Sequence, residues 1–254
     1  MTLFDLKGKV AVVTGGNGGI GLGMAKGLAA AGCAIVVAAR NADKSSRAVK
    51  ELEGLGVRAA AISVDVADEP SVETLIARAV EAFGRIDIVV NNAGTNVRKP
   101  PEELALAEWH HVMDTNLTSA FLVSRAAYPH MKRQGGGKVI NIGSMMSIFG
   151  ASFTTPYAAS KGGIVQMTRA MACAWAKDNI QVNAVLPGWI DTDLTRNARK
   201  DVAGLHERVL ARTPAGRWGD PADFAGIAVF LASAASDFLT GTAIPVDGGY
   251  SIQG

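Results

Sequence analysis

Short apolar stretches rich in β-branched residues alternate with longer stretches of helical period along this 254-residue chain. One helical stretch, 69–83, places apolar residues at spacings of three and four on a single face. Strands that alternate with helices predict an α/β fold in which a seven-stranded parallel sheet is doubly wound, with helices on both faces. The seven predicted strands are VAVVT from Val10, AIVVAA from Ala34, AAAISVDV from Ala59, IDIVVNNAG from Ile86, GKVINIGS from Gly137, IQVNAVLPG from Ile180 and TAIPVDGG from Thr242.

The pattern is least regular from Trp189 to about Gly216, where charged residues are frequent and no strand is indicated. So long an excursion within a compact domain is usually functional, often as a lid over a site. We therefore expect residues 1–254 to form a single dinucleotide-binding and catalytic domain with a substrate lid around 189–216.

Composition narrows the class of protein. Hydrophobic residues make up 48% of the chain, charged residues 19%, and the formal net charge is only +2. No run of lysine and arginine is long enough to follow a nucleic-acid backbone, so we expect no nucleic-acid partner. Apolar runs stay below the roughly 18 residues of a membrane span, and the N-terminus lacks the layout of a secretory signal, so we expect no membrane partner and a cytoplasmic location. The two cysteines, Cys33 and Cys173, have apolar neighbours in the sequence, which predicts buried, inert thiols.

A glycine-rich turn, TGGNGGIG, separates the first strand from a helix. Glycines let the backbone approach a pyrophosphate closely, and the helix start offers unpaired N–H groups. Two templates fit, one with Gly16, Gly18 and Gly21, the other beginning at Thr14. This placement predicts a dinucleotide site, while a tight turn without a ligand stays open as the alternative.

The second strand ends in Ala38, Ala39, Arg40 and Asn41. NAD sites usually place an acid here to accept hydrogen bonds from the adenosine ribose. The acid is missing, and Arg40 could pair with a 2′-phosphate, which favours NADP(H). An Arg40 side chain stacked on the adenine would remain compatible with NAD(H).

The stretch YAASK places Tyr157 and Lys161 four positions apart in a segment of helical period, so both side chains reach one cleft. A phenol has an ordinary pKa near 10, and a nearby ammonium group lowers that pKa. We therefore predict Tyr157 as a general acid/base, with Ser144 at the neighbouring strand end bonding the same substrate oxygen. Hydride chemistry would belong to the cofactor.

These motifs together make the chain resemble the short-chain dehydrogenase/reductase family, classical type, over essentially its whole length. The resemblance rests on TGGNGGIG, NNAG at 91–94, YAASK, and PG at 187–188 followed by Thr192. It implies a single-domain Rossmann-type fold, an NAD(P)(H)-dependent oxidoreductase that interconverts a secondary alcohol and a ketone, and a homotetramer. It also implies a catalytic set of Asn116, Ser144, Tyr157 and Lys161, in which Asn116 holds a water in a proton relay.

The glycine turn and the resemblance together give the predicted cofactor-binding residues. They are Gly15, Asn17, Gly18, Gly19, Ile20, Gly21, Arg40, Asn41, Asp65, Val66, Asn92, Ala93, Gly94, Tyr157, Lys161, Pro187, Gly188, Ile190 and Thr192.

Other stretches, such as GTNVRKP at 94–100 and PAGRWG at 214–219, are similar to gluconate 5-dehydrogenases and 2-deoxygluconate 3-dehydrogenases, which implies a sugar acid or related polyol as substrate. Arg98 and Lys99, which follow the NNAG strand, could bind the carboxylate of a sugar acid, or they could be solvated surface charges. The predicted substrate contacts are Arg98, Ser144, Met146, Tyr157 and Trp189. An apolar wall formed by Met145, Met146, Phe149 and Trp189 keeps a nonpolar cyclic ketone open.

Two further functions stay open. A 3-oxoacyl thioester reductase would use Arg98 and Lys99 as a basic surface, and a dinucleotide-binding sensor would have no turnover. A metal site is not predicted, because His110 and His111 point about 100° apart on a helix and the other two histidines, His130 and His206, are isolated.

Overall fold

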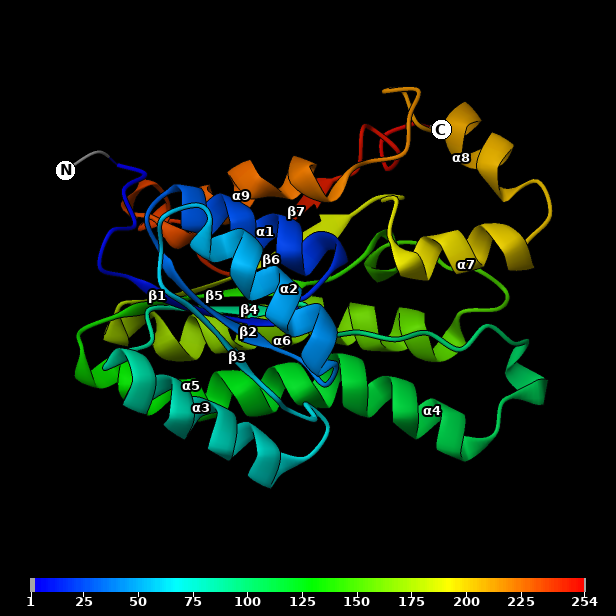
Figure 1. The fold of residues 1–254 in the computed structure, drawn as a ribbon. Coiled ribbons are helices and arrows are strands. Elements are labelled where there is room, and N and C mark those ends of the chain that lie inside the picture. The colour runs from blue at the N-terminus through cyan, green and yellow to red at the C-terminus, as the bar shows by residue number, and fades with distance from the viewer. Residues whose placement is uncertain (1–2, 254) are drawn as a thin grey trace.

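A seven-stranded, all-parallel sheet forms the centre of the computed structural model, which describes residues 3–253 (Figure 1). The strand order is β3-β2-β1-β4-β5-β6-β7, which reverses direction at β1 and β4. All seven predicted strands are confirmed. Their bounds are β1 Val10–Thr14, β2 Ala34–Ala38, β3 Ala59–Ile62, β4 Ile88–Asn91, β5 Gly137–Ile142, β6 Ile180–Pro187 and β7 Ala243–Val246.

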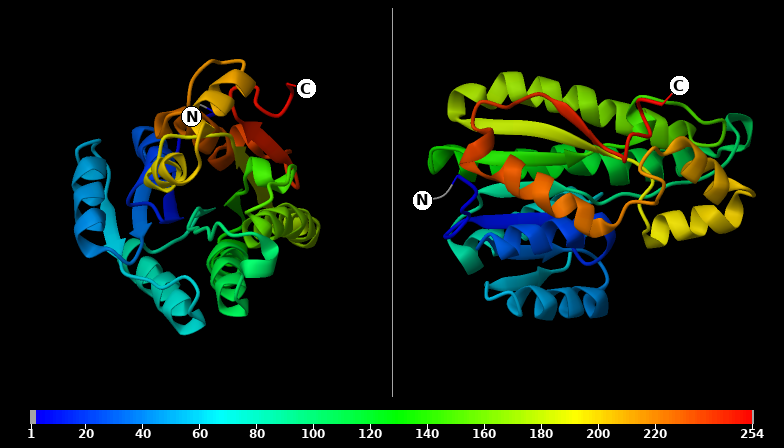
Figure 2. Two further views of the ribbon diagram at one scale, coloured as in Figure 1. Left: turned by 90° about the vertical axis from the view of Figure 1, so that its right-hand side faces the viewer. Right: turned by 90° about the horizontal axis from the view of Figure 1, so that it is seen from above.

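Helices cover both faces of the sheet, as Figures 1 and 2 show. Helices α1 (Gly19–Ala30), α2 (Ala42–Glu53) and α9 (Ala225–Ala232) pack on one face around a core that includes Val13, Ile35 and Phe224. Helices α3 (Glu69–Phe83), α5 (Ser119–Arg133) and α6 (Thr155–Trp175) cover the other. The predicted doubly wound fold is therefore confirmed.

Glycines set the distance between α1 and its neighbours. A Cβ at Gly23 would lie 2.0 Å from the carbonyl oxygen of Pro221, in the short helix η5 (Pro221–Phe224), and one at Gly27 would lie 2.7 Å from Cα of Ala225. Only a residue without a side chain fits at this separation. The dense glycines of this stretch thus serve helix packing as well as the turn before α1.

The apolar positions that repeat every three or four residues in the helical stretches are buried in the structure. In α3 the predicted stripe is buried at Val72, Leu75, Ile76 and Ala79, while Val80 and Phe83 are partly buried against the same core. Helix α4 (Leu106–Met113) leads into a π-helical turn, Asp114–Thr118, before α5 begins. Single π-turns of this kind are frequent at functional sites.

The segment 189–216 is more regular than its sequence pattern indicates. It contains α7 (Asp193–Asp201) and α8 (Leu205–Arg212), which project beyond the sheet in Figures 1 and 2. The two helices pack through a small cluster in which Ala198, Leu205 and Val209 are buried against Trp189 and Trp218. So few buried apolar positions give a weak periodic signal, which is why the pattern did not reveal the helices.

One cysteine prediction was wrong. Cys33 is buried, and burial raises the pKa of its thiol, but Cys173 is exposed on α6. Apolar neighbours in sequence do not fix which side of a helix a residue occupies, and Cys173 lies on the side turned away from the core. Within residues 3–253, no helix is long and apolar enough to cross a membrane.

Candidate active site

A cavity of about 300 Å³ lies beyond the carboxyl ends of β1, β4, β5 and β6. This is where parallel α/β sheets bind ligands, next to the point at which the strand order reverses. Fourteen predicted cofactor-binding residues line it: Gly15, Asn17, Gly18, Gly19, Ile20, Asn92, Ala93, Gly94, Tyr157, Lys161, Pro187, Gly188, Ile190 and Thr192.

The other five predicted cofactor residues do not line this cavity. Gly21 lies beneath the turn, where a Cβ would stand 2.4 Å from the Asn92 amide nitrogen. Arg40 and Asn41 lie between β2 and α2, and the Asn41 side chain caps α2 by accepting a hydrogen bond from Lys44 N (2.8 Å). Asp65 and Val66 follow β3, with Val66 buried and Asp65 exposed.

The cavity is also lined by residues that the sequence analysis did not select. They are Lys44, Ile142, Gly143, Asp193, Leu194 and Thr195. Gly143 lies directly between β5 and Ser144, so adjacency to a predicted residue could have indicated it. Lys44 and Asp193 lie on separate helices far apart in sequence, and no local pattern could have paired them.

The glycine turn has the room that a dinucleotide pyrophosphate needs. Gly18 caps the start of α1, and within residues 3–253, its two chain neighbours apart, no atom lies within 4 Å of where a Cβ at Gly18 would stand. Asn92 holds the turn against β4, because its amide donates to the carbonyl oxygens of Thr14 (3.0 Å) and Gly15 (3.2 Å). The Thr14 hydroxyl in turn accepts from the backbone N–H groups of Asn92 and Ala93. The residues present therefore fit a dinucleotide.

Tyr157 and Lys161 lie on the first two turns of α6 and face the same cavity. The Lys161 ammonium is 5.6 Å from the centre of the Tyr157 ring and donates a 2.7 Å hydrogen bond to the carbonyl oxygen of Ile142. Lys161 is only 4% exposed. Burial penalises its charged form and lowers its pKa to about 8.

The pKa of Tyr157 is raised, whereas the sequence predicted that Lys161 would lower it. Burial of the phenol is the largest influence and raises its pKa above the ordinary value. A hydrogen bond with Ser144 and the positive charge of Arg98 oppose this rise. Proximity of Lys161 alone was therefore an insufficient basis for expecting a lowered pKa.

Two further residues of the predicted catalytic set are held next to this pair. Ser144 caps a short 3₁₀ helix, Met145–Ser147, and its hydroxyl accepts from Met146 N (3.1 Å). Asn116 lies in the π-turn before α5 and is buried. Its side chain accepts from Thr95 N (2.8 Å) and donates to Thr95 O (3.0 Å) and to the Ser160 hydroxyl (3.1 Å). Ser144 lines the cavity, whereas Asn116 lies behind Gly94, within 3.4 Å of where a Cβ there would stand.

Arg98 lies between Tyr157 and α7. Its guanidinium faces Asp201 at 3.6 Å and donates to the carbonyl oxygen of Leu194 at 3.4 Å, and its side chain is 19% exposed. It is close enough to influence the pKa of Tyr157. This arrangement differs from that of a freely solvated surface charge.

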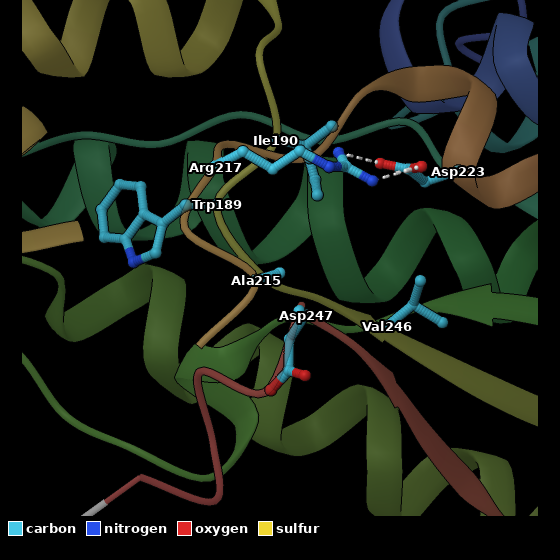
Figure 3. A pocket seen from close by; sticks show the side chains of 9 residues that line it. Trp189, Ile190, Ala215, Arg217, Asp223, Val246 and Asp247 are labelled. Atoms are coloured by element: carbon cyan, nitrogen blue, oxygen red, sulfur yellow. Dashed lines mark hydrogen bonds and ion pairs between the residues drawn. The ribbon is translucent and has the colours of Figure 1, made fainter. Parts of the chain in front are cut away.

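Arg98 does not line the cavity, and neither do the other two predicted substrate residues, Met146 and Trp189. Met146 is half-buried, with its sulfur near the Thr154 hydroxyl at 3.9 Å. Trp189 packs edge-on against Trp218, with ring centres 5.6 Å apart, and lines a second cavity of about 220 Å³. In Figure 3 the Arg217 side chain reaches across this second cavity to Asp223, while the Trp189 indole points away from that pair.

Comparisons with known proteins agree with this geometry. A family model described as enoyl-(acyl carrier protein) reductase matches residues 15–251. The chain is 46% identical to a 2-dehydro-3-deoxy-D-gluconate 5-dehydrogenase of Escherichia coli K12 over 251 residues, which cover 98% of each protein.

Solved structures are similar over nearly the full length. A gluconate 5-dehydrogenase from Burkholderia cenocepacia J2315, in complex with NADP and tartrate, is 41% identical with a TM-score of 0.94, covering 99% of this chain and 98% of that one. A short-chain type dehydrogenase/reductase from Mycobacterium marinum is 37% identical with a TM-score of 0.93, covering 98% of each chain. The chain therefore belongs to the short-chain dehydrogenase/reductase family and is an NAD(P)-dependent oxidoreductase.

Proposed function

We propose that this enzyme interconverts the secondary alcohol and the ketone of a sugar acid, and that Arg98 binds the carboxylate. The observation that carries the proposal is the position of Arg98, whose charge acts on the Tyr157 phenol. A guanidinium so close to the acid/base favours a substrate with a negative charge near its reacting carbon. The names of the similar proteins, a 2-dehydro-3-deoxy-D-gluconate 5-dehydrogenase and a gluconate 5-dehydrogenase, support the same class.

In this proposal Tyr157 takes the proton of the substrate hydroxyl during oxidation and returns it during reduction. The bound nicotinamide supplies the hydride chemistry. Ser144 hydrogen-bonds the reacting oxygen and stabilises the charge that develops on it. Lys161 would hold the nicotinamide ribose and would pass protons to solvent through a water held by Asn116.

The cofactor preference that we propose is NADP(H). No acid follows β2 to accept from the adenosine ribose, and the exposed Arg40 at this point is available for a 2′-phosphate. The predicted roles of Asn41, Asp65 and Val66 around the adenosine belong to the same proposal, since these residues follow β2 and β3 at the same edge of the sheet.

The thioester alternative has weaker support in this structure. It needs Arg98 and Lys99 together as a basic docking surface for an acyl carrier, but Lys99 donates a 2.6 Å hydrogen bond to Glu108. Arg98 is used by both proposals, so it is the pairing of Lys99 that weakens this alternative. The nonpolar cyclic ketone alternative relied on an apolar wall of Met145, Met146, Phe149 and Trp189, and none of these four residues lines the cavity. Trp189 packs against Trp218 instead.

We further propose that α7 and α8 form the lid over the substrate, that the enzyme works as a homotetramer, and that it acts in the cytoplasm. The lid proposal is supported by Asp193, Leu194 and Thr195, which border the cavity at the start of α7. Light scattering of the purified protein tests the tetramer.

Initial rates at 340 nm test the substrate class. The panel pairs each aldonic acid with the polyol in which a hydroxymethyl group replaces the carboxylate, and it adds cyclic alcohols, the matching ketones and acetoacetyl thioesters, each with NADP(H) and NAD(H). We expect selective activity on the acids. Activity confined to uncharged or thioester substrates would contradict the sugar-acid proposal and leave the family assignment intact.

A further inference from the structure

Lys44 and Asp193 form an ion pair at the rim of the dinucleotide cavity. Lys44 lies in the first turn of α2 and Asp193 is the first residue of α7, and the ammonium nitrogen is 3.0 Å from a carboxylate oxygen. Both residues line the cavity. The pair therefore joins the helix after β2, on the adenosine side, to the helix that begins the proposed lid.

Charge at this cavity is unevenly distributed. Among the described residues that line it, Lys44 and Lys161 are the cations and Asp193 is the only acid. A dinucleotide brings two negative charges on its pyrophosphate, and a 2′-phosphate adds between one and two more. A carboxylate on the wall repels such a ligand, unless a cation offsets it.

Lys44 is the main group that stabilises the negative charge of Asp193. The hydrogen bond and the charge of Lys44 are the largest influences that lower the pKa of Asp193, with Arg196 a weaker one. Arg196 lies farther from it, at 3.4 Å, and also binds Asp191. When phosphate oxygens arrive beside Lys44, they compete with the Asp193 carboxylate for the same ammonium group.

We propose that Lys44 and Asp193 are opposed determinants of cofactor affinity: Lys44 attracts the cofactor phosphates, and Asp193 weakens binding by competing for Lys44 and by repelling them. The effect applies to both cofactors and is larger for NADP(H), which carries more negative charge. It rests on the dinucleotide site and not on the choice of substrate or on the proposed preference for NADP(H).

Equilibrium binding of NADP⁺ and NAD⁺, followed by isothermal titration calorimetry, tests the proposal with D193N and K44M. Because exposed ion pairs have modest energies, we expect D193N to tighten NADP⁺ binding by about two- to fivefold and K44M to weaken it by about five- to tenfold. Both changes should be smaller for NAD⁺ and should shrink in about 1 M salt, where screening is strong.

Two variants serve as matched controls. D201N removes the acid at the other end of α7, and K50M removes an exposed lysine at the other end of α2; neither residue lines the cavity. Both should leave cofactor affinity unchanged. A weaker affinity in D193N would overturn the proposal, because it would mean that the pair clasps the bound cofactor. Unchanged affinity in either D193N or K44M would overturn it as well. If the wild-type enzyme prefers NAD⁺ and D193N still tightens binding as expected, this proposal stands and only the proposed NADP(H) preference is contradicted.

Discussion

The positive charge of Arg98 lowers the pKa of the Tyr157 phenol, against the rise that burial imposes. Arg98 follows β4 and Tyr157 lies in the first turn of α6, so the charge reaches the phenol only because β4 ends and α6 begins on the same side of the folded sheet. The residue proposed to hold the substrate carboxylate therefore also tunes the residue proposed to move the proton. In this proposal, substrate binding and acid/base chemistry are coupled through the charge of Arg98.

The substitution Arg98→Met should change both the pH profile, through the pKa of Tyr157, and the KM, through the lost carboxylate contact, so the two effects can be measured separately. Loss of the charge should raise the pKa of Tyr157, so alcohol oxidation, which needs the phenolate, should move to higher pH. Loss of a charge-assisted hydrogen bond, about 1.5–3 kcal/mol, should raise KM for an aldonic acid by roughly 10- to 150-fold. The pH dependence of kcat and of KM checks both effects.

The matched control for Arg98 is Lys99→Met, since Lys99 pairs with Glu108. It should leave the pH profile in place. An Arg98→Met enzyme with an unmoved profile would show that Arg98 does not act on the phenol.

Removing the Tyr157 hydroxyl should abolish most turnover. Tyr157→Phe removes the proposed acid/base and keeps the ring, so kcat should fall by about 10²- to 10⁴-fold while NADP⁺ affinity changes little. Tyr128→Phe is the control, because the Tyr128 hydroxyl donates to Asp178, which follows the C-terminal end of α6, and neither residue lines the cavity. Turnover equal to wild type in Tyr157→Phe would refute the assigned role.

Asn116 should matter for stability as well as for catalysis. Asn116→Ala leaves the N–H and carbonyl groups of Thr95 without their partner, which should lower the free energy of unfolding by about 2–3 kcal/mol. Urea unfolding checks this, with Gln166→Ala, exposed on α6, as the control. A variant as stable as the control would mean that water replaces the lost hydrogen bonds without cost.

Gly18 of the cofactor turn and Gly23 of α1 should respond differently to substitution. Gly23→Ala places a Cβ 2.0 Å from the Pro221 carbonyl oxygen, so it should destabilise the fold by about 1–3 kcal/mol. Gly18→Ala meets no atom within 4 Å but fills space above the cofactor turn, so it should weaken NADP⁺ binding and leave stability nearly unchanged. Thermal unfolding and calorimetric titration of both variants distinguish the roles; equal effects of the two on stability would contradict this division.

The sequence predicted the strands and the glycine turn well because both depend on local features. A parallel sheet buried on both faces requires apolar strands, and backbone approach to a phosphate requires glycine. The fourteen predicted residues around the cavity were identified by the glycine turn and by the motifs that carry the family resemblance, and most of them lie in the turns that follow β1, β4 and β6. Local pattern and global fold agree at these positions.

The sequence failed where the outcome depends on long-range packing. The helices α7 and α8 bury too few apolar side chains to give a clear period, and Trp189 turned out to pack against Trp218. The Tyr157 pKa is governed by burial and by Arg98, neither of which its neighbours in the chain reveal. The pairing of Lys44 with Asp193 likewise exists only after the chain has folded.

Lys161 should make the stability of the free enzyme rise with pH. Its pKa is about 8 in the folded chain and near 10.4 in an unfolded one. Below pH 8 both states hold the proton, and the cost of burying the charge is fully present. Between pH 8 and about 10.4 the unfolded chain keeps a proton that the folded chain has released, so stability increases with pH over this window.

The difference between wild type and Lys161→Met isolates this contribution from other groups that titrate in the same range. From pH 7 to pH 9.5 the wild type should gain about 2 kcal/mol of unfolding free energy relative to the variant. Urea unfolding at the two pH values and one protein concentration checks it, with Lys50→Met, an exposed lysine on α2, as the control. The absolute stability of Lys161→Met carries a second effect, since the Ile142 carbonyl loses its 2.7 Å partner. That loss does not vary with pH, so parallel pH curves for wild type and Lys161→Met would mean that burial does not lower the pKa of this lysine.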